Sequence, residues 1–548
     1  MKKTALTTAI ALGLGLSTGV FADSNTANVT QLGVGDTATV DQTVGATNNL
    51  AEVLQQNGST NQAFVTQNDS DDSRAYITQD SAVSSTATVN QLNAALANTA
   101  SVNQYNGTSG SDATINQTGT TNDGVINQDH AGAFGLGSSA TLSQDGDQNQ
   151  SDILQSHTDG SAASVSQTGI QNDASVTQYG FGIHNPAAAT VIQTGDLNMA
   201  DVDQNVSTDA VSTVTQSGTG NSANVDQVNN SARADATVNQ TGSDQYSTVY
   251  QSGAEDSSAL ITQLNNGGAT SATVNQIDST NSSGTVYQED MTSGDAMITQ
   301  LNGSGNLGNV YQYHGTNVLG SITQEGNSNS ADVNQQHVNT TTATVAQTGD
   351  LNSAVVTQYG WGVHNPANAT VDQTGNENSA NVNQNTSTDA TASLTQLGNL
   401  NVADIDQVSN STNANVALTV TGNGNSTTVM QSSAANSDTT FALTGDSNTL
   451  LVNQTASDNS VSGDVYGMGN DMTITQSSTL NSVTVDGTGI VDNSVLSVTQ
   501  AGVGSHMADV TWAGANHTAT ISQSGLSQMA TLSQSGTGNV ANIMQGTP

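Results

Sequence analysis

The 548-residue sequence has no cysteine, three prolines, 3% aromatic residues and only four basic side chains against 45 acidic ones. The lack of cysteine excludes a disulfide framework. A formal net charge of -41 argues against binding to nucleic acid or to an anionic membrane, because both need a basic footprint. Five phenylalanines and two tryptophans are too few for the apolar core that an enzyme of this length normally builds.

The first 22 residues differ in kind from the rest. Lys2 and Lys3 precede an apolar stretch that runs to Val20, and Ala22 supplies a small residue for cleavage. This order predicts a secretory signal peptide at residues 1–22 and a secreted chain, with a short membrane anchor as the alternative. Residues 23–548 keep the same Gly, Asn, Ser, Thr, Gln and Ala bias throughout, which predicts one continuous architecture without membrane insertion.

Glutamine recurs at most steps every 11 to 13 residues, beginning at Gln31. The residues before each glutamine alternate as A-x-V-x-Q, for example in the segment Ala223-Asn224-Val225-Asp226-Gln227. A period of two indicates a β-strand in which Ala, Val and Gln share one face. The pattern x-G-x-x-N usually follows, and its Gly and Asn tolerate the positive φ of a tight turn.

A fixed repeat of this kind predicts an all-β solenoid with two strands in each rung. The sequence offers 39 glutamine-bearing strand positions and five more that carry Val420, Leu443, Val465, Val485 or Trp512 instead, which gives 44 strands or about 22 rungs. A buried glutamine is costly only when it is unpaired, so we expect like amides to stack on one another. The glutamines expected to form this ladder include Gln31, Gln42, Gln167, Gln178, Gln193, Gln204, Gln216, Gln227, Gln324, Gln335, Gln347, Gln358, Gln373, Gln384, Gln396, Gln407, Gln523, Gln534 and Gln545.

Five positions of the repeat recur together at fixed spacing, and the copies include Gln216, Gly218, Asn221, Ala223 and Gln227, and Gln324, Gly326, Asn329, Ala331 and Gln335. The spacing Q-x-G-x-x-N-x-A-x-x-x-Q resembles the curlin repeat of curli-type bacterial functional amyloids. The resemblance implies a secreted subunit that polymerises into cross-β fibres of the extracellular biofilm matrix and mediates adhesion and cohesion. It also implies a curli-type secretion channel and accessory or nucleator proteins as partners.

The ends of the repeat array favour self-association. Soluble solenoids normally close their ends with atypical capping repeats, because an open rung exposes unpaired backbone groups. Here the copies begin within a few residues of Ala22 and continue to Gln545. We therefore expect uncapped rungs that template fibre growth. The alternative is a monomeric acidic adhesin or surface spacer that does not polymerise.

Acidic side chains occupy mostly outward or turn positions, such as Asp203, Asp226 and Asp332. Their simplest role is solubility. A sharper hypothesis is that stacked like charges slow fibre growth, which acid or salt would then speed. Calcium bridging is a further alternative, although the G-G-x-G-x-D pattern of calcium solenoids is missing.

A longer repeat is superimposed on the short one. Residues 144–227, the first block, match residues 324–407, the second block, at an offset of 180. Each block contains a widened turn, within residues 178–193 and 358–373, that brings aromatic, His and Pro residues into the chain. These turns are candidate contact points for a partner, or else tolerated insertions. Fifteen strand steps separate them, and this odd number predicts that they lie on opposite edges of the stack.

No motif indicates an enzyme. Residues 303–308 fit a dinucleotide-binding pattern, but they lie in a repeat turn with no helix to follow. The eight histidines are spread through turns without metal-ligand spacing. An ice-binding solenoid would need regular outward T-x-T rows, which are missing. We therefore expect no catalytic residues, no cofactor and no metal.

Overall fold

The computed structural model describes residues 24–43, 45–94, 96–132, 136–180, 186–360 and 367–546. The predicted signal peptide and the inner parts of both widened turns, residues 181–185 and 361–366, lie outside these ranges. In the described ranges every helix or strand is a strand, and the total of 44 strands confirms the predicted number.

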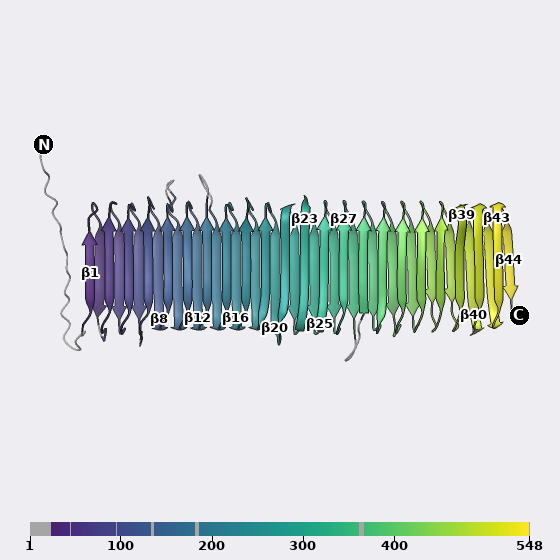
Figure 1. Ribbon diagram of the computed structural model, residues 1–548, viewed down its shortest axis with the longest axis horizontal. Coiled ribbons are helices and arrows are strands. Elements are labelled where there is room, and N and C mark those ends of the chain that lie inside the picture. Colours follow the sequence, from purple (N-terminus) through teal and green to yellow (C-terminus); the bar gives the residue numbers. More distant parts are fainter. Residues whose placement is uncertain are drawn as a thin grey trace, which may run out of the picture. The chain divides into compact units, whose positions relative to one another are not determined.

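The strands alternate between two parallel sheets and form a β-solenoid of about 21 turns with two strands in each rung (Figure 1). Each strand pairs in parallel with the strand two positions away in the chain, as β15 (Met199–Asn205) does with β17 (Ser222–Val228). The two strands of a rung run in opposite directions and a turn joins them at each edge (Figure 1). The predicted fold class is therefore confirmed.

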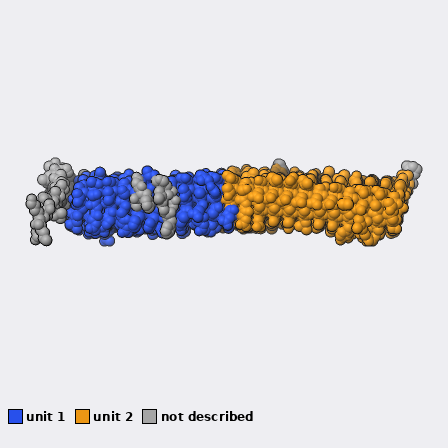
Figure 2. All heavy atoms as spheres, turned by 90° about the horizontal axis from the view of Figure 1, so that it is seen from above, with its two compact units in different colours: residues 1–265, 276–278 blue, residues 266–275, 279–548 orange. Residues whose placement is uncertain are grey.

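The chain divides into two compact units, coloured separately in Figure 2. Unit 1 comprises residues 1–265 and 276–278, and unit 2 comprises residues 266–275 and 279–548. The boundary falls in β20 (Ser258–Asn266) and β21 (Thr270–Thr280). Both units repeat the same two-strand rung.

The strands of unit 1 carry the repeats from Gln31 to Gln251. Its odd-numbered sheet contains β1 (Thr26–Gln31), β3 (Leu50–Gln56), β5 (Arg74–Asp80), β7 (Thr99–Tyr105), β9 (Asp123–Asp129), β11 (Gln150–Ser156), β13 (Asp173–Tyr179), β15, β17 and β19 (Gln245–Ser252). Its even-numbered sheet contains β2 (Thr37–Thr43), β4 (Gln62–Asn68), β6 (Thr86–Leu92), β8 (Asp112–Thr120), β10 (Ser139–Asp147), β12 (Ala162–Ile170), β14 (Ala188–Asp196), β16 (Val211–Thr219) and β18 (Asp235–Ser243).

The strands of unit 2 carry the repeats from Gln288 to Gln545. Its odd-numbered sheet contains β23 (Thr292–Ser304), β25 (Thr316–Glu325), β27 (Thr342–Thr348), β29 (Ala367–Thr374), β31 (Ala390–Leu397), β33 (Asn415–Thr421), β35 (Asp438–Thr444), β37 (Ser460–Tyr466), β39 (Ser482–Asp492), β41 (Met507–Ala515) and β43 (Met529–Thr537). Its even-numbered sheet contains β22 (Ser283–Glu289), β24 (Leu307–Tyr313), β26 (Ser330–Gln336), β28 (Ser353–Tyr359), β30 (Ser379–Asn385), β32 (Val402–Val408), β34 (Ser426–Ser432), β36 (Thr449–Gln454), β38 (Asp471–Gln476), β40 (Val495–Gly504), β42 (Thr518–Leu526) and β44 (Val540–Gln545).

The core lies between the two sheets and follows the period-two pattern of the sequence. In β17, Ala223, Val225 and Gln227 are buried, while the residues between them are half-buried on the outward face. The register places alanine on alanine, valine on valine and glutamine on glutamine in β15 and β17. Because one rung holds only a few small apolar side chains, it gains its stability from the rungs on either side.

Candidate functional site

The ladder glutamines of each sheet lie directly over one another and are paired along the stack. Gln204 donates from Nε2 to Oε1 of Gln227 at 2.8 Å and accepts from Nε2 of Gln178 at 2.9 Å. Its Nε2 also donates to the backbone carbonyl of Ala188 in β14, on the other sheet, at 3.0 Å. Each such amide links three strands, and the predicted stacking of like on like is confirmed.

The glutamine rows have a direction. Gln31 donates to Gln55 at 2.7 Å near the start of the chain, and Gln523 donates to Gln545 at 2.9 Å near its end. Among the described residues, the donor in each glutamine pair is the residue from the rung nearer the N-terminus. One side of a rung therefore presents amide donors and the other side presents carbonyl acceptors.

The structure places all the predicted ladder glutamines at inward positions. Gln31, Gln42 and Gln545 are half-buried because they lie in the first or last described strands of their sheets. The others are at most 5% exposed: Gln167, Gln178, Gln193, Gln204, Gln216, Gln227, Gln324, Gln335, Gln347, Gln358, Gln373, Gln384, Gln396, Gln407, Gln523 and Gln534.

The odd-numbered row of unit 2 loses its glutamines over five successive strands, β33 to β41. Val420, Leu443 and Val465 occupy the predicted positions and are at most 1% exposed. Trp512 also occupies its predicted position, and its Nε1 donates to Oε1 of Gln534 at 3.0 Å. The indole thus replaces the amide as the donor where the glutamine row resumes.

The prediction that Val485 takes a glutamine position is wrong. Val485 pairs with Gly463 and Val510, which lie at the valine position of the repeat. Gly487 pairs with Trp512 and therefore holds the glutamine position. The register shifts between Gly487 and Val491, and this irregularity makes β39 longer than a spacing count from its neighbours implies.

The turn glycines meet the backbone of the next rung. Gly218 has φ of 123°, and a Cβ placed on it would lie 1.9 Å from the carbonyl oxygen of Gly242. Gly326 has φ of 107°, and its Cβ would lie 2.1 Å from the carbonyl oxygen of Gly349. Both the positive φ and the contact exclude a larger residue, which explains the glycine of the repeat.

The turn asparagines form a second buried amide row beside these glycines. Asn221 donates from Nδ2 to Oδ1 of Asn198 at 3.1 Å and to the carbonyl of Gly242 at 3.2 Å. Asn329 donates from Nδ2 to the carbonyl of Gly349 at 2.7 Å. These bonds satisfy turn carbonyls that the sheet ladder does not reach, so the Gly and Asn of the repeat act together. Ala223, the remaining repeat residue, is 2% exposed in the core.

The two widened turns follow strands of opposite parity. The first follows β13 and joins an odd-numbered to an even-numbered strand, whereas the second follows β28 and joins an even-numbered to an odd-numbered strand. The count of fifteen strand steps between them is therefore confirmed. The same holds for the buried asparagine rows, since Asn221 precedes an odd-numbered strand and Asn401, its counterpart 180 residues later, precedes an even-numbered one.

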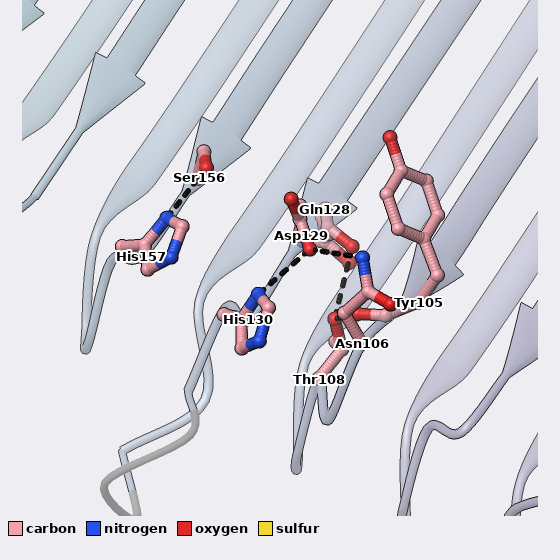
Figure 3. A network of polar contacts seen from close by, with 8 residues as sticks. All are labelled: Tyr105, Asn106, Thr108, Gln128, Asp129, His130, Ser156 and His157. Atoms are coloured by element: carbon pink, nitrogen blue, oxygen red, sulfur yellow. Dashed lines mark hydrogen bonds and ion pairs between the residues drawn. The ribbon is translucent and has the colours of Figure 1, made fainter.

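A row of aromatic rings leads to each widened turn. In unit 1, the rings of His130 and His157 stack with centroids 4.7 Å apart, and Tyr179 lies 5.5 Å from His157. Figure 3 shows the turn contacts of this row: Asp129 Oδ1 accepts from Asn106 Nδ2 at 2.9 Å and lies 2.8 Å from Nδ1 of His130. Sequence reasoning treated these histidines as ordinary turn residues, although their spacing by one rung was visible.

The corresponding row of unit 2 is built in the same way. The rings of His314 and His337 stack with centroids 5.2 Å apart, and Tyr359 lies 5.6 Å from His337. His314 Nε2 lies 3.3 Å from Asp290 Oδ2. The two rows therefore share a chemistry of stacked imidazoles with an acidic neighbour.

The outward acidic residues form a row in unit 1. Asp203 and Asp226 are neighbours in register, and Asp201 lies on the same face. Burial, followed by the charges of Asp226 and Asp201, raises the pKa of Asp203. Burial also raises the pKa of Asp226, against a hydrogen bond from Asn224 that lowers it. These carboxylates therefore take up protons at a higher pH than an isolated aspartate does.

The first and last described rungs expose part of the face that every other rung buries. In β1, Ala27 is exposed and Val29 is half-buried, whereas Ala51 and Val53, their partners in β3, are 0% and 2% exposed. In β44, Ile543 is half-buried, whereas its partner in β42 is fully buried. These two faces present apolar side chains, ladder amides and a sheet edge together.

The described residues provide no other obvious centre of chemistry. Within them, no group of three or more His, Asp or Glu side chains is placed to hold a metal ion. They also contain no helix with the length and apolar character needed to span a membrane. Neither a scan against protein-family models nor a search of the curated proteins found a match.

Proposed function

We propose that this chain is a secreted structural subunit of the curlin-repeat type, which polymerises rung upon rung into curli-like fibres of the extracellular biofilm matrix. In this role it mediates adhesion and cohesion mechanically, without catalysis and without a cofactor. The observation that carries the proposal is the complementarity of the first and last described rungs, which are the two halves of the contact that holds the interior together.

The glutamine rows supply this complementarity. Gln534 and Gln545 each donate to a backbone carbonyl of their own rung pair, at Thr518 and Met529, and their second N–H points along the row. Gln31 and Gln42 begin their rows among the described residues, so no described glutamine donates to their Oε1 atoms. A second copy placed in register joins these donors to these acceptors, as every interior pair does.

A contact between the last rung of one copy and the first rung of the next is head-to-tail. Such a heterologous interface does not close on itself and generates an open filament. Half-exposed apolar side chains at both faces, including Val29 and Ile543, become buried by the same step. Stacking therefore adds hydrophobic burial to the backbone and amide hydrogen bonds.

Secretion and export follow from the sequence. The predicted signal peptide leads to the periplasm, and the curlin-like repeat favours export through a curli-type channel with accessory or nucleator proteins. The acidic surplus keeps the free subunit soluble and away from nucleic acid and anionic membranes. The competing function is a monomeric acidic adhesin that uses the same solenoid as a spacer.

The test uses residues 23–548 and one matched pair of variants in β44. Ile543→Asp places a carboxylate on the inward face, whereas Met544→Asp places it on the outward face of the same strand, where Met544 is 77% exposed. We expect Met544→Asp to form fibres in thioflavin assays and electron microscopy and Ile543→Asp to remain soluble. Added in small amounts to unmodified chain, Ile543→Asp should stop growth at one fibre end, because its first rung is intact.

Two outcomes would contradict the proposal. If unmodified residues 23–548 stay monodisperse at high concentration for days, the chain is better described as the monomeric adhesin. If Ile543→Asp polymerises as fast as Met544→Asp, the fibre contact lies elsewhere on the solenoid.

A further inference from the structure

A pair of stacked tyrosines lies on the outward face of the even-numbered sheet of unit 2. Tyr287 in β22 and Tyr311 in β24 are direct partners in register. Their ring centroids are 5.0 Å apart and the rings are parallel within 4°. Tyr313 lies beside them with its centroid 6.4 Å from that of Tyr311. Between described residues, these are the two ring contacts that join tyrosine to tyrosine.

A carboxylate is in place to receive the proton of one phenol. Tyr287 donates its hydroxyl hydrogen to Oε2 of Glu289 at 2.5 Å. This hydrogen bond, together with burial, raises the pKa of Tyr287 to about 12. The phenol is therefore protonated at neutral pH, and its oxidation has to release a proton as well as an electron. Glu289 is the adjacent base for that proton.

We propose that Tyr287 and Tyr311 are a site of oxidative dityrosine formation, a covalent link between two neighbouring rungs. The oxidant is hydrogen peroxide acting through a haem peroxidase. Each phenol loses one electron and one proton, the proton of Tyr287 passing to Glu289 and that of Tyr311 to water. The two phenoxyl radicals join by a carbon–carbon bond between ring positions ortho to the oxygens, and the ring hydrogens then move to those oxygens. Overall the protein loses two hydrogen atoms, and one hydrogen peroxide becomes two waters.

The geometry favours this pair over the other tyrosines. Parallel in-register strands hold the two rings against one another, so radical coupling needs only side-chain rotation. Tyr76, by contrast, has Glu52 and Ser101 as its register partners. Both members of the pair lie in one chain, so the link does not depend on polymerisation and the inference stands apart from the proposed function.

The experiment treats soluble residues 23–548 with hydrogen peroxide and a haem peroxidase. We expect an intact mass lower by two hydrogens, the fluorescence of dityrosine, and a cross-linked proteolytic fragment that contains Tyr287 and Tyr311. Tyr311→Phe keeps a stacked ring but should abolish the link, whereas Tyr76→Phe and Tyr313→Phe should leave it unchanged. Glu289→Gln should slow the initial rate several-fold with the same final product.

A transfer variant tests the geometry in unit 1. Asp226 is the register partner of Tyr250, so Asp226→Tyr creates a second in-register pair and should add a second link. The proposal is overturned if Tyr311→Phe retains the dityrosine signal, or if the fragments show links spread among all the tyrosines. It is also overturned if links form only between separate chains.

Discussion

The first and second blocks share their inward and turn residues but differ on the outward face. In the first block, Asp203 and Asp226 are stacked carboxylates. In the second block, Asn383 stands where Asp203 does and donates from Nδ2 to Oδ1 of Asp406 at 3.1 Å. The same rung thus carries a repulsive row in one copy and a hydrogen-bonded row in the other. The inward face and the turns specify the fold, and the outward face is free to set the response to pH and salt.

The inward rows also differ in one respect. Gln216 of the first block accepts from Gln193 and donates to Gln240, so it has a glutamine on both sides. Its counterpart Gln396 accepts from Gln373 but is followed by Val420. The first block therefore lies inside a continuous ladder, and the second block contains the place where one ladder stops.

The largest expected effect breaks the equivalence of these two glutamines. Gln216→Leu leaves a donor and an acceptor unpaired in the core, and we expect it to destabilise β16 by about 2–6 kcal/mol. Gln396→Leu leaves only the Gln373 donor unpaired, and we expect about half that loss in β31. The carbonyl across the rung loses its donor in both variants, so this contribution cancels. Native-state hydrogen exchange of the two strands measures the difference, and equal losses would refute the role of the ladder partners.

The second prediction concerns a feature that the blocks share. Gly218→Ala and Gly398→Ala should each cost about 2–3 kcal/mol, because φ is positive at both sites and the Cβ would meet a glycine carbonyl at 1.9 and 2.1 Å. Gly220→Ala is the control, since its Cβ would meet only the flexible side chain of Asp244, and about 1 kcal/mol is expected. Denaturant or exchange measurements that give the control the larger loss would contradict this explanation of the turns.

The third prediction sharpens the outward comparison by pH. The folded-state pKa of Asp203 lies above the ordinary value of 3.8, so its contribution to stability is present below that value and is lost as pH rises through the folded pKa. Acidification from neutral pH should therefore stabilise the first block and speed fibre growth. Asp203→Asn should flatten this response, and Asn383→Asp should install one in the second block, each by at most about 1 kcal/mol. Hydrogen exchange and thioflavin kinetics across pH 7 to 4 test it, and an unchanged slope in both variants would exclude the row as its source.

The smallest effect is that of salt. Raising ionic strength shortens the Debye length from about 10 Å at 0.1 M to about 3 Å at 1 M and so weakens repulsion between exposed carboxylates. We expect a gain of a few tenths of a kcal/mol in the first block and less in the second. Asp203→Asn should remove most of the difference between the blocks. A larger gain in the second block would contradict the assignment of repulsion to the first.

The sequence predicted the features that depend on period and spacing. The alternation around Gln204 or Gln227 determines a strand and its inward face, and the turn residues Gly218 and Asn221 determine where it ends. Val485 was misassigned because the irregular segment after Gly487 changes the register without changing the residue types. Counting positions cannot detect such a shift.

Other features needed coordinates because they arise between rungs. The direction of the glutamine bonds depends on how each amide is oriented, which residue type does not encode. The stack of Tyr287 on Tyr311 was accessible in principle, because each immediately precedes a ladder glutamine in adjacent even-numbered strands. The five strands without glutamine all lie in one sheet, which strand parity alone would have revealed.

The central claim is that the last rung of one copy stacks on the first rung of the next in the same way as interior rungs stack. Cryo-electron microscopy of fibres grown from residues 23–548 tests it most directly. We predict that β1 and β2 of one chain follow β43 and β44 of its neighbour at one strand spacing, about 4.8 Å, with all chains pointing the same way. Fibres in which chains meet side by side or head to head would contradict the claim.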